Sequence, residues 1–418
     1  MHAEIIAIGD EITSGRLLDS NSQWLSLRVE ELGIRVLYHA TVGDELEPCA
    51  DVFRRAIDRA DVVVVTGGLG PTADDLTREA IAEATGRPLV LDPASLEHIR
   101  GIFARRRRDM PPRNERQALL PTGARMIPNP EGTAPGVLLE VPRTDRPPCR
   151  LFALPGVPAE MREMWHGTVA GELRQAGAGR RAVRYRQLNC FGAGESQIEA
   201  MLPDLVRRGR SPRVGINASR ATIILRITAE GATDEECDAA IEPVAATIRD
   251  CLGNRVFGEG DQQLQDVLVE LLRQRRRTLA VVEWGTAGLV NHWLGTAAGA
   301  GGPFLGGLVV ADKAALPTAL DVSADLVERH GSVSAETARA MAEHCRRRFG
   351  ADYALSIGPF PPLDPKASEP ASFFVAFAGP NGVVAHEFPY AGHPELLPIL
   401  GAKRALNVAR LALGAVET

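Results

Sequence analysis

Two strand-like segments near the N-terminus each end in glycine followed by acidic residues. The segment AEIIAI (residues 3–8) is followed by Gly9, Asp10 and Glu11. The segment VVVVT (residues 62–66) is followed by a loop that contains Gly67, Gly68, Gly70, Thr72, Asp74 and Asp75. Glycine tolerates positive φ and close backbone approach, so backbone N–H groups can face a phosphate. Glycines at a strand end therefore predict a phosphate site, and the adjacent carboxylates raise the question of what offsets their charge.

A divalent cation would offset that charge. Four carboxylates are candidates for holding Mg²⁺ or a related ion, directly or through water: Asp10, Glu11, Asp74 and Asp75. The ion would bridge to the phosphates, polarise a phosphoryl oxygen and activate water, which predicts metal-assisted hydrolysis of a phosphoanhydride. An interpretation of these acids that involves no ligand is also possible. Acids in the first turn of a helix stabilise the macrodipole, and Thr72-x-x-Asp75 has the spacing of a capping box.

The elements around this loop alternate between strand and helix patterns over residues 1–168. Strands are predicted at 3–8, 35–43, 61–65 and 149–156, with helices at 19–32, 45–60, from Thr72 to Thr85, and from 158 onward. A strand that is apolar throughout, such as DVVVV, is typical of the centre of a parallel sheet. The pattern predicts an α/β fold with a doubly wound parallel sheet, in which ligands bind beyond the carboxyl ends of the strands.

The rest of the chain divides into a small α+β module and a second alternating unit. The module has strand patterns AVRYRQLNCFG and ATIILRITAEG, and helical patterns at 195–208 and 234–252; RRGRSPRVG (207–215) reads as a turn and residues 257–263 as a linker. The last unit has strands TLAVVE, GGLVVA, YALSIG and SFFVAFAG and a C-terminal helix at 394–413. We therefore expect domains at 1–170, 171–257 and 262–416.

Composition limits the classes of partner and compartment. The formal net charge of -6 argues against a generic nucleic-acid binder, and the arginine runs at 105–108 and 273–277 are typical of solvated faces. The six cysteines form no C-x-x-C pair, which favours reduced thiols. The N-terminus lacks the features of a signal peptide, and the Gly-rich stretch 287–311 is a poor membrane span. We expect a cytoplasmic protein with neither a membrane nor a nucleic-acid partner.

Several motifs in order carry a resemblance to a known family. TGGLGPTADD resembles the signature loop of the molybdopterin-binding domain family. Together with GDEITSGRLLDSNSQWL (9–25), NERQALLPTGARMIPNPEGTAPG (114–136) and LPGVPAEMREMW (154–165), it makes the chain resemble the CinA family (competence/damage-inducible protein A). The resemblance is dense over residues 1–168 and continues through the chain. It implies a homodimer whose N-terminal domain hydrolyses ADP-ribose to AMP and ribose 5-phosphate with a divalent metal ion (Mg, Mn or Co).

The resemblance also implies roles for individual residues. It places Asp10, Glu11, Asp74 and Asp75 in catalysis, the last three of them at the metal. The substrate-binding positions that it implies are Gly9, Asn21, Gly67, Gly68, Gly70, Thr72, Asn129, Gly132, Thr133, Pro155, Gly156 and Pro158. Two of these have a purely structural alternative, because Pro158 suits the first turn of a helix and Asn129 suits the cap of a turn. The middle module corresponds to a KH-like domain, but no G-x-x-G loop lies between its helical patterns, so RNA binding is not expected.

The last unit resembles the CinA C-terminal domain, which in relatives deamidates nicotinamide mononucleotide (NMN). That family reads Glu-Ser-Cys-Thr-Gly-Gly with a nucleophilic Ser, whereas this chain reads Glu283, Trp284, Gly285, Thr286, Ala287, Gly288. The family's Tyr and Lys positions fall on Ala311 and Leu316, and its third loop is replaced by IGPFPPLDPKASEP (357–370). An indole cannot attack an amide, so NMN deamidation is predicted to be absent.

Alternatives remain for both sites. Thr286 with Lys313 as its base would be a rebuilt nucleophile. Trp284 would either stack on the base of a nucleotide that is bound without turnover or pack in the core. For the first site, the alternatives to a hydrolase are a non-catalytic nucleotide- or pterin-binding protein and a partner-binding scaffold.

Overall fold

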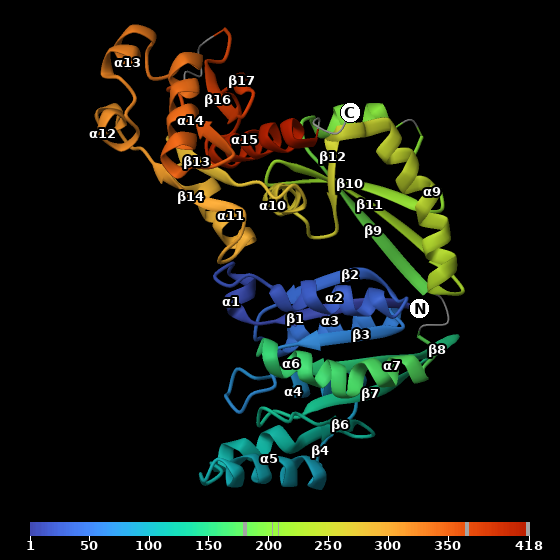
Figure 1. The fold of residues 1–418 in the computed structure, drawn as a ribbon. Helices are drawn as coiled ribbons and strands as arrows, with labels where there is room; N and C mark the ends of the chain where they lie inside the picture. Colours follow the sequence, from blue (N-terminus) through green and yellow to red (C-terminus); the bar gives the residue numbers. More distant parts are fainter. Residues whose placement is uncertain (179–181, 203, 208, 364–367, 415–418) are drawn as a thin grey trace. The chain divides into compact units, whose positions relative to one another are not determined.

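The computed structural model describes residues 1–178, 182–202, 204–207, 209–363 and 368–414 (Figure 1). By its internal contacts the chain falls into two compact units. One comprises residues 1–184 and 230–238, and the other comprises residues 185–229 and 239–418. Each unit is described by itself below.

The first unit is built on a mixed sheet with the strand order β2-β1-β3-β8-β7-β6. The parallel strands are β1 (His2–Ile8), β2 (Arg35–Val42), β3 (Val62–Thr66) and β8 (Arg146–Leu154). The antiparallel strands at one edge are β7 (Gly136–Arg143) and β6 (Arg125–Ile127). A separate small sheet pairs β4 (Leu89–Leu91) with β5 (Leu119–Pro121). The predicted parallel sheet is confirmed, with an antiparallel edge that the sequence patterns did not predict.

Helices cover both faces of this sheet. They are α1 (Asp10–Thr13), α2 (Ser20–Glu31), α3 (Leu46–Arg59), α4 (Thr77–Thr85), α5 (Pro93–Arg105), α6 (Pro158–Met164) and α7 (Ala170–Gln175), with a 3-10 turn at Pro112–Ala118 and a π turn at Trp165–Val169. Leu25 of α2 and Met161 of α6 pack on one face, while Phe53 of α3 and Ile81 of α4 pack on the other. The sheet is therefore doubly wound.

The order of the strands fixes where a ligand can bind. The chain leaves β1 toward β2 on one side and returns to β3 on the other, and Ala7 of β1 pairs with Thr66 of β3. The loops that follow β1 and β3 therefore diverge at neighbouring strand ends, which is a topological switch point. In open α/β sheets ligands bind at such a point.

The middle module forms an antiparallel sheet that is larger than the sequence patterns predicted. Its strand order is β10-β11-β9-β12, with β9 (Ala182–Cys190), β10 (Arg213–Ser219), β11 (Thr222–Gly231) and β12 (Val256–Glu259). Its helices are α8 (Glu195–Met201) and α9 (Asp234–Leu252), followed by a 3-10 turn at Gly253–Arg255. The helix predicted over 195–208 ends at Met201, and positions 203 and 208 lie outside the described residues.

Two loop predictions in this module are wrong. Part of the expected turn 207–215 belongs to β10, which pairs along its length with β11. The expected linker 257–263 begins inside β12, which pairs with β9. The reason is burial, because Phe257 packs with Leu264 and Leu268 of the following helix. A segment that carries a buried aromatic residue is part of a core and not a free linker.

The C-terminal part of the second unit is a mixed sheet with the order β14-β13-β15-β16-β17. Its strands are β13 (Leu279–Glu283), β14 (Phe304–Val309), β15 (Tyr353–Ile357), β16 (Ser372–Gly379) and β17 (Gly382–Pro389). Its helices are α10 (Leu264–Gln274), α11 (Leu289–Ala298), α12 (Leu316–Leu320), α13 (Ala324–His330), α14 (Ala335–Phe349) and α15 (Leu397–Gly414), with a 3-10 turn at Lys313–Ala315. Within the described ranges, no helix is long and apolar enough to cross a membrane.

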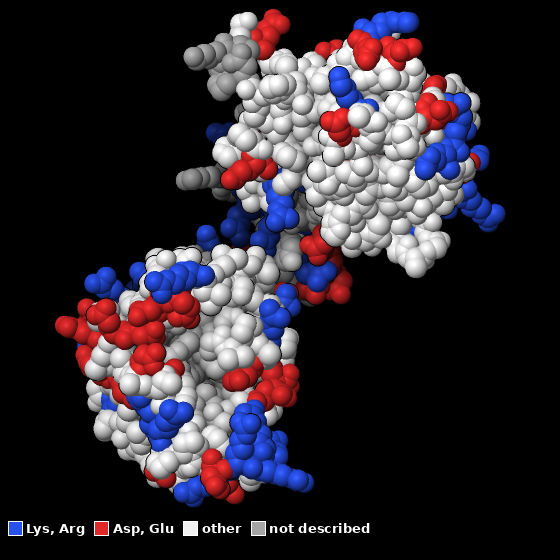
Figure 2. All heavy atoms as spheres, turned by 90° about the vertical axis from the view of Figure 1, so that its left-hand side faces the viewer, with Lys and Arg blue, Asp and Glu red and all other residues white. Residues whose placement is uncertain are grey.

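Charged side chains are mixed on the face of the molecule shown in Figure 2. Acidic groups lie beside basic groups, with broad uncharged areas between them. On this face the described residues do not form the continuous basic stripe that is typical of a nucleic-acid-binding surface, which accords with the net charge of -6.

Candidate functional site

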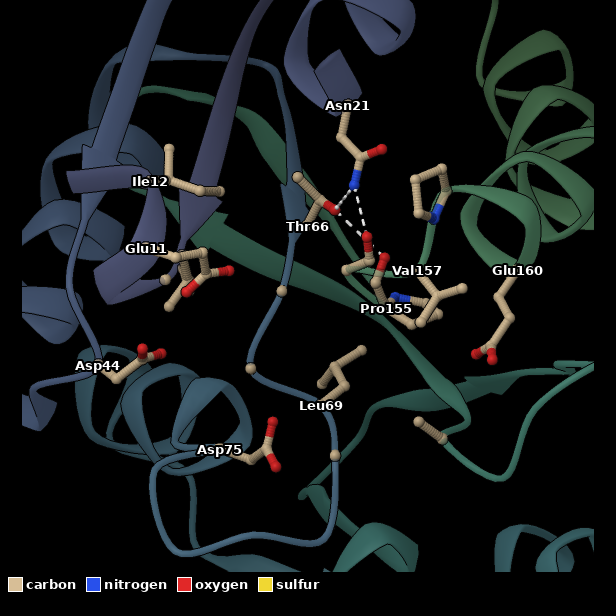
Figure 3. A pocket seen from close by; sticks show the side chains of 18 of the residues that line it. Glu11, Ile12, Asn21, Asp44, Thr66, Leu69, Asp75, Pro155, Val157 and Glu160 are labelled. Carbon is tan, nitrogen blue, oxygen red and sulfur yellow. Dashed lines mark hydrogen bonds between the residues drawn. The ribbon is translucent and has the colours of Figure 1, made fainter. Parts of the chain in front are cut away.

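A cavity of about 640 Å³ lies at the carboxyl ends of the parallel strands of the first unit (Figure 3). Each of these strands contributes the loop that follows it. The contributions are Gly9 and Glu11 after β1, Asp44 after β2, the glycine loop 67–75 after β3, and residues 155–158 after β8. The volume is typical of a small-molecule site, and the location is the switch point of the sheet.

Most of the sequence-predicted residues line this cavity. They are Gly9, Glu11, Asn21, Gly67, Gly68, Gly70, Asp74, Asp75, Thr133, Pro155, Gly156 and Pro158. Four others are not among its lining residues: Asp10, Thr72, Asn129 and Gly132. Each of the four takes part in hydrogen bonds within the loops that line the cavity. These residues therefore support the lining loops and do not themselves face the cavity.

The glycine loop has glycine where a side chain would not fit. Gly67 has φ of 108°, and a Cβ there would run into the backbone oxygen of Ile8. Gly68 has φ of 63°, and a Cβ there would run into Oγ1 of Thr77. Among the described residues, none accepts a hydrogen bond from the backbone N–H of Gly68, Leu69 or Gly70. Such free donors on consecutive residues are the kind of concavity that binds anions.

A buried arginine holds the loop from its other side. Arg78 of α4 is fully buried, and its two terminal nitrogens donate to the backbone oxygens of Leu69 and Gly70, each at 2.8 Å. Burial lowers the pKa of this guanidinium to about 10. Buried Gln117 adds a hydrogen bond from Nε2 to the Leu69 oxygen at 3.3 Å. Because these carbonyls are bound away from the cavity, the loop is held in the conformation that leaves its N–H groups free.

The helix after this loop starts later than predicted. The capping-box pattern predicts a start near Thr72, but α4 begins at Thr77. The Asp75 carboxylate does accept from the Thr72 backbone N–H at 2.8 Å and from the Thr72 hydroxyl, but these bonds close a turn inside the loop. Thr77 is bound to the loop instead, with its backbone N–H on the Gly68 oxygen at 3.2 Å and its hydroxyl on the Gly67 oxygen at 2.8 Å.

Arg116 clamps the outer part of the loop. Its guanidinium donates to the backbone oxygens of Thr72 and Asp75 and to the carboxylate of Glu79 at 2.8 Å. Arg116 and Gln117 both belong to the NERQA segment, whose role no sequence pattern revealed. The segment lies on the 3-10 turn at Pro112–Ala118 and serves to hold the glycine loop.

Carboxylates gather on one side of the cavity. Figure 3 shows Glu11, Asp44 and Asp75 on that side, with Glu160 on the opposite side. The pKa of Asp44 is raised by partial burial and by the charges of Asp10, Glu11 and Asp74. The pKa of Asp74, which is exposed, is lowered chiefly by the nearby Thr72 side chain and by its own backbone N–H. Burial is the larger cause of the raised pKa of Asp44, and the neighbouring carboxylates add to it.

The donor set fits a hard divalent cation. In the described part of the chain, no group of three or more His, Cys, Asp or Glu side chains lies at metal-ligand spacing. A complete protein cage is therefore not present. Mg²⁺ and related ions do not need one, because they are commonly held by one or two carboxylates and complete their shell with water and substrate phosphates. One or two of the carboxylates of Glu11, Asp44, Asp74 and Asp75 would hold such an ion.

The opposite wall is fixed by a network of neutral polar groups. Nδ2 of Asn21 donates to Oγ1 of Thr66 at 3.0 Å and to the backbone oxygen of Gly156 at 2.8 Å. The Thr66 hydroxyl donates in turn to the Pro155 oxygen at 3.2 Å. These bonds tie the start of α2 and the end of β3 to the loop after β8 (Figure 3).

Asn129 caps the turn that follows it, which is the structural alternative given for this residue above. It is fully buried, its Oδ1 accepts from the Gly132 backbone N–H at 2.9 Å, and its Nδ2 donates to the Ala134 oxygen at 2.9 Å. Nδ2 also donates to Oε2 of Glu160 at 2.7 Å. Asn129 thus holds the loop that presents Thr133 to the cavity.

Several site residues were missed from the sequence. Asp44 carries the clearest unused signal, because Gly43-Asp44 follows β2 as Gly9-Asp10 follows β1. Glu160 was hidden within a helix start, where an acid needs no ligand to be favourable. Arg78 gave no signal, because an arginine on a helix is ordinarily solvated.

In the second predicted site, the polar groups are bound to one another. Glu283 is fully buried, and its carboxylate accepts from the Thr286 hydroxyl at 2.5 Å, from the Val290 backbone N–H at 3.0 Å, and from the backbone and side-chain nitrogens of Asn291 at 2.6 Å each. Thr286 is only 4% exposed. A buried hydroxyl that is already bound to a carboxylate is poorly placed to act as the rebuilt nucleophile.

The neighbouring positions of this site are also filled. Trp284 packs partly buried against the core beside α14, Ala311 is exposed, and Leu316 is fully buried in that core. Phe360, on the altered third loop, stacks on Tyr390 with centroids 4.8 Å apart, and a Cβ at Gly285 would lie 2.8 Å from its ring. Positions 364–367 of that loop lie outside the described residues.

The fold and the site together define a class of protein: a multidomain chain whose first domain is of the molybdopterin-binding type. Family models agree, since the model described as "Probable molybdopterin binding domain" matches residues 4–175, "Damage-inducible protein CinA KH domain" matches 185–258, and "CinA C-terminal domain" matches 261–413. The CinA-like protein of Nostoc sp. is 36% identical over 99% of both chains, and that of Dictyoglomus thermophilum is 38% identical over 85% of both. The chain belongs to the CinA family. A solved structure of CinA from Thermoplasma acidophilum is 32% identical and covers 41% of this chain and 98% of its own, with a TM-score of 0.38.

Proposed function

We propose that the first unit hydrolyses ADP-ribose to AMP and ribose 5-phosphate with the help of a divalent cation. The observation that carries the proposal is the pairing of two opposite features in one cavity. The free N–H groups of Gly68, Leu69 and Gly70 suit phosphate oxygens, and the carboxylates across from them suit a cation. A cavity with only the first feature would bind a phosphate, and a cavity with only the second would repel it.

The reaction needs one water and no other reactant. The water oxygen forms a bond to one phosphorus of the diphosphate, and the bond from that phosphorus to the bridging oxygen breaks. The electron pair of that bond stays on the departing phosphate, and the proton of the water passes to a carboxylate of the acidic side. A bound Mg²⁺, Mn²⁺ or Co²⁺ would supply polarisation of a phosphoryl oxygen and a lowered pKa for water. The chain itself holds the phosphates at the glycine loop and supplies carboxylates on the acidic side.

A second candidate is a binding protein without hydrolytic activity. It is favoured by the description of the matching family model, which names molybdopterin binding, and by the lack of a three-ligand group among the described residues. A pterin or a nucleotide would then occupy the same cavity without being cleaved.

The experiment that separates the two is an assay of AMP release. Purified protein is incubated with ADP-ribose and Mg²⁺, Mn²⁺, Co²⁺ or a chelator, and AMP is followed by chromatography. We expect metal-dependent AMP that is lost in Asp74→Asn, a change at the cavity, and kept in the matched control Asp58→Asn, on the exposed side of α3. ADP-ribose that is bound but not cleaved with any of the ions would establish the binding protein instead.

We propose that the second site is inactive as an NMN deamidase. The support is the loss of the family's Ser, Tyr and Lys positions and the burial of Thr286. Incubation with nicotinamide mononucleotide should release no ammonia above a blank. Ammonia release that disappears in Thr286→Val would instead support Thr286 as the nucleophile. The family resemblance supports a homodimer, and the free state of the six cysteines is in keeping with the proposed cytoplasmic setting. Sedimentation velocity measures its mass directly.

A further inference from the structure

The cavity of the first unit is charged unequally on its two sides. Glu11, Asp44 and Asp75 lie together on one side, and Glu160 stands opposite, across the glycine loop (Figure 3). Glu160 lies in the first turn of α6, and the side chains before it that line the same wall are apolar, namely Pro155, Val157 and Pro158. Glu160 therefore does not belong to the carboxylate group that suits a cation.

Glu160 is held by one of its two oxygens. Oε2 accepts a hydrogen bond from Nδ2 of buried Asn129 at 2.7 Å, and the carboxylate lies against Gly132, where a Cβ would collide with it. Within the described chain, Oε1 accepts no hydrogen bond. The amide thus fixes the carboxylate and leaves one acceptor oxygen for a ligand.

The chemistry of that oxygen selects its partner. An ionised carboxylate only accepts hydrogen bonds and repels phosphate, so the matching group is a neutral donor. A sugar hydroxyl is such a donor, and a carboxylate on ribose hydroxyls is the way in which dinucleotide-binding sheets hold a ribose beside a glycine loop. This chain shares two of those features, a glycine loop for the diphosphate and one carboxylate held near it, but Glu160 follows β8 and not the second strand of the sheet.

We propose that Glu160 binds the hydroxyl groups of a ribose of the ligand, so that the cavity distinguishes a ribose-bearing nucleoside diphosphate from a bare diphosphate. This inference rests on the proposed function for the identity of the ligand. It adds a specificity-determining residue that is not required for the attack on phosphorus.

The test is Glu160→Gln. The variant amide keeps an oxygen for Asn129 and turns the free acceptor into a donor of the same shape, so the loop at 129–134 is preserved. Two probes are used in the presence of Mg²⁺, namely ADP-ribose and inorganic pyrophosphate, which has no ribose. Pyrophosphate binding is measured by calorimetry, and ADP-ribose binding by calorimetry if it is not cleaved and from KM if it is. We expect ADP-ribose affinity to fall at least about tenfold, the usual effect of losing a hydrogen bond to a charged group, and pyrophosphate affinity to stay within about twofold.

Thermal unfolding of the variant and inhibition by AMP and by ribose 5-phosphate complete the experiment. A selective loss for one of these products identifies which ribose Glu160 contacts. Equal loss for ADP-ribose and pyrophosphate, or unchanged affinity for ADP-ribose, would overturn the proposal.

Binding and turnover separate this proposal from the hydrolase. If the wild type binds ADP-ribose without cleaving it and the variant binds it weakly, the hydrolase fails and the role of Glu160 stands. If the wild type cleaves ADP-ribose and the variant has an unchanged KM, the hydrolase stands and the role of Glu160 fails. If the wild type does not bind ADP-ribose, both are overturned.

Discussion

Asp10 and Asp44 are joined by two reciprocal hydrogen bonds. The Asp10 backbone N–H donates to Oδ2 of Asp44 at 2.9 Å, and the Asp44 backbone N–H donates to Oδ1 of Asp10 at 3.1 Å. The bonds lock the loops after β1 and β2 together at the rim of the cavity. Partial burial raises the pKa of Asp44, and the nearby charges of Asp10, Glu11 and Asp74 raise it further.

Replacing Asp44 by Asn should raise the stability of the fold and weaken the use of the metal ion. An aspartate whose pKa is higher in the folded than in the unfolded state is penalised when it is charged, so stability falls as the pH rises through the folded pKa. Asp44→Asn removes that penalty and keeps an acceptor oxygen for the Asp10 N–H. We expect the free energy of unfolding of the variant at neutral pH without metal to be higher than that of the wild type by up to about 0.5 kcal/mol. The Mn²⁺ concentration for half-maximal activity should rise.

The measurement is denaturant unfolding at several pH values, with the metal titration run in parallel. The stability difference between variant and wild type should shrink as the pH falls and the wild-type carboxyl takes up its proton. A variant that is less stable than the wild type at neutral pH would contradict the electrostatic account, and an unchanged metal dependence would remove Asp44 from the cation side.

Two glycines on either end of α4 offer a matched pair. Gly68 and Gly86 have nearly the same φ, at 63° and 64°. A Cβ at Gly68 runs into Oγ1 of Thr77, whereas a Cβ at Gly86 meets nothing within 4 Å. Gly86→Ala should cost about 1 kcal/mol, the strain of the left-handed conformation alone. Gly68→Ala should cost more and should also abolish AMP release, because relief of the clash moves the glycine loop. Equal losses of stability, with activity retained in both, would show that the loop tolerates the side chain.

Arg78 should be indispensable for the order of the glycine loop. Arg78→Met leaves the partly buried carbonyl of Gly70 without its donor and leaves the buried carbonyl of Leu69 with only the longer bond from Gln117, and an unsatisfied buried carbonyl costs about 1–3 kcal/mol. We expect a loss of about 3 kcal/mol in the free energy of unfolding and no detectable turnover. Arg87→Met is the matched control, because partly exposed Arg87 also donates to two backbone oxygens, those of Thr122 and Glu140, and water can replace it there. Comparable losses in the two variants would mean that burial of Arg78 has no special effect.

The sequence was sufficient for features that depend on short-range patterns. Apolar runs such as DVVVV identified the central strands, and the strand order placed Gly9 and Gly67 at one edge, because carboxyl ends of parallel strands meet there. The positions of glycine and of acids then located the cavity. This works because a strand end, a glycine and a charge leave a signal at the residue itself.

The features that were missed depend on how the chain turns back on itself. Arg78 is recognised only once Leu69 and Gly70 fold back over it, and the Thr72–Asp75 pair looked like a helix cap because the same bonds close a turn. Phe257 looked like part of a linker because its partners, Leu264 and Leu268, lie on the helix that follows it. In each case the decisive contact is with a residue whose place the local pattern does not encode.

A buried lysine in the second unit gives the last prediction. Lys403 of α15 is 5% exposed, and its Nζ donates to the hydroxyl of buried Thr222 at the start of β11. Burial, with a smaller effect of the nearby Arg220 charge, lowers the pKa of Lys403 to about 8. The unfolded chain therefore binds this proton more tightly than the folded chain, so stability rises with pH between the folded pKa and the ordinary lysine value.

Lys403→Met removes the cost of burying the ammonium while filling the same space. We expect the variant to be more stable than the wild type at neutral pH by about 1 kcal/mol, and the gain to shrink toward pH of about 10, where the wild-type amine is neutral. Lys313→Met, at an exposed position, is the control and should change stability little at any pH. Denaturant unfolding of the three proteins across this pH range measures the effect. A gain that does not depend on pH would mean that burial of the charge is not its source. A destabilised Lys403→Met would mean that the Thr222 contact outweighs the burial of the charge. It would also mean that Lys403 stabilises the packing of α15 against the middle module through that hydrogen bond.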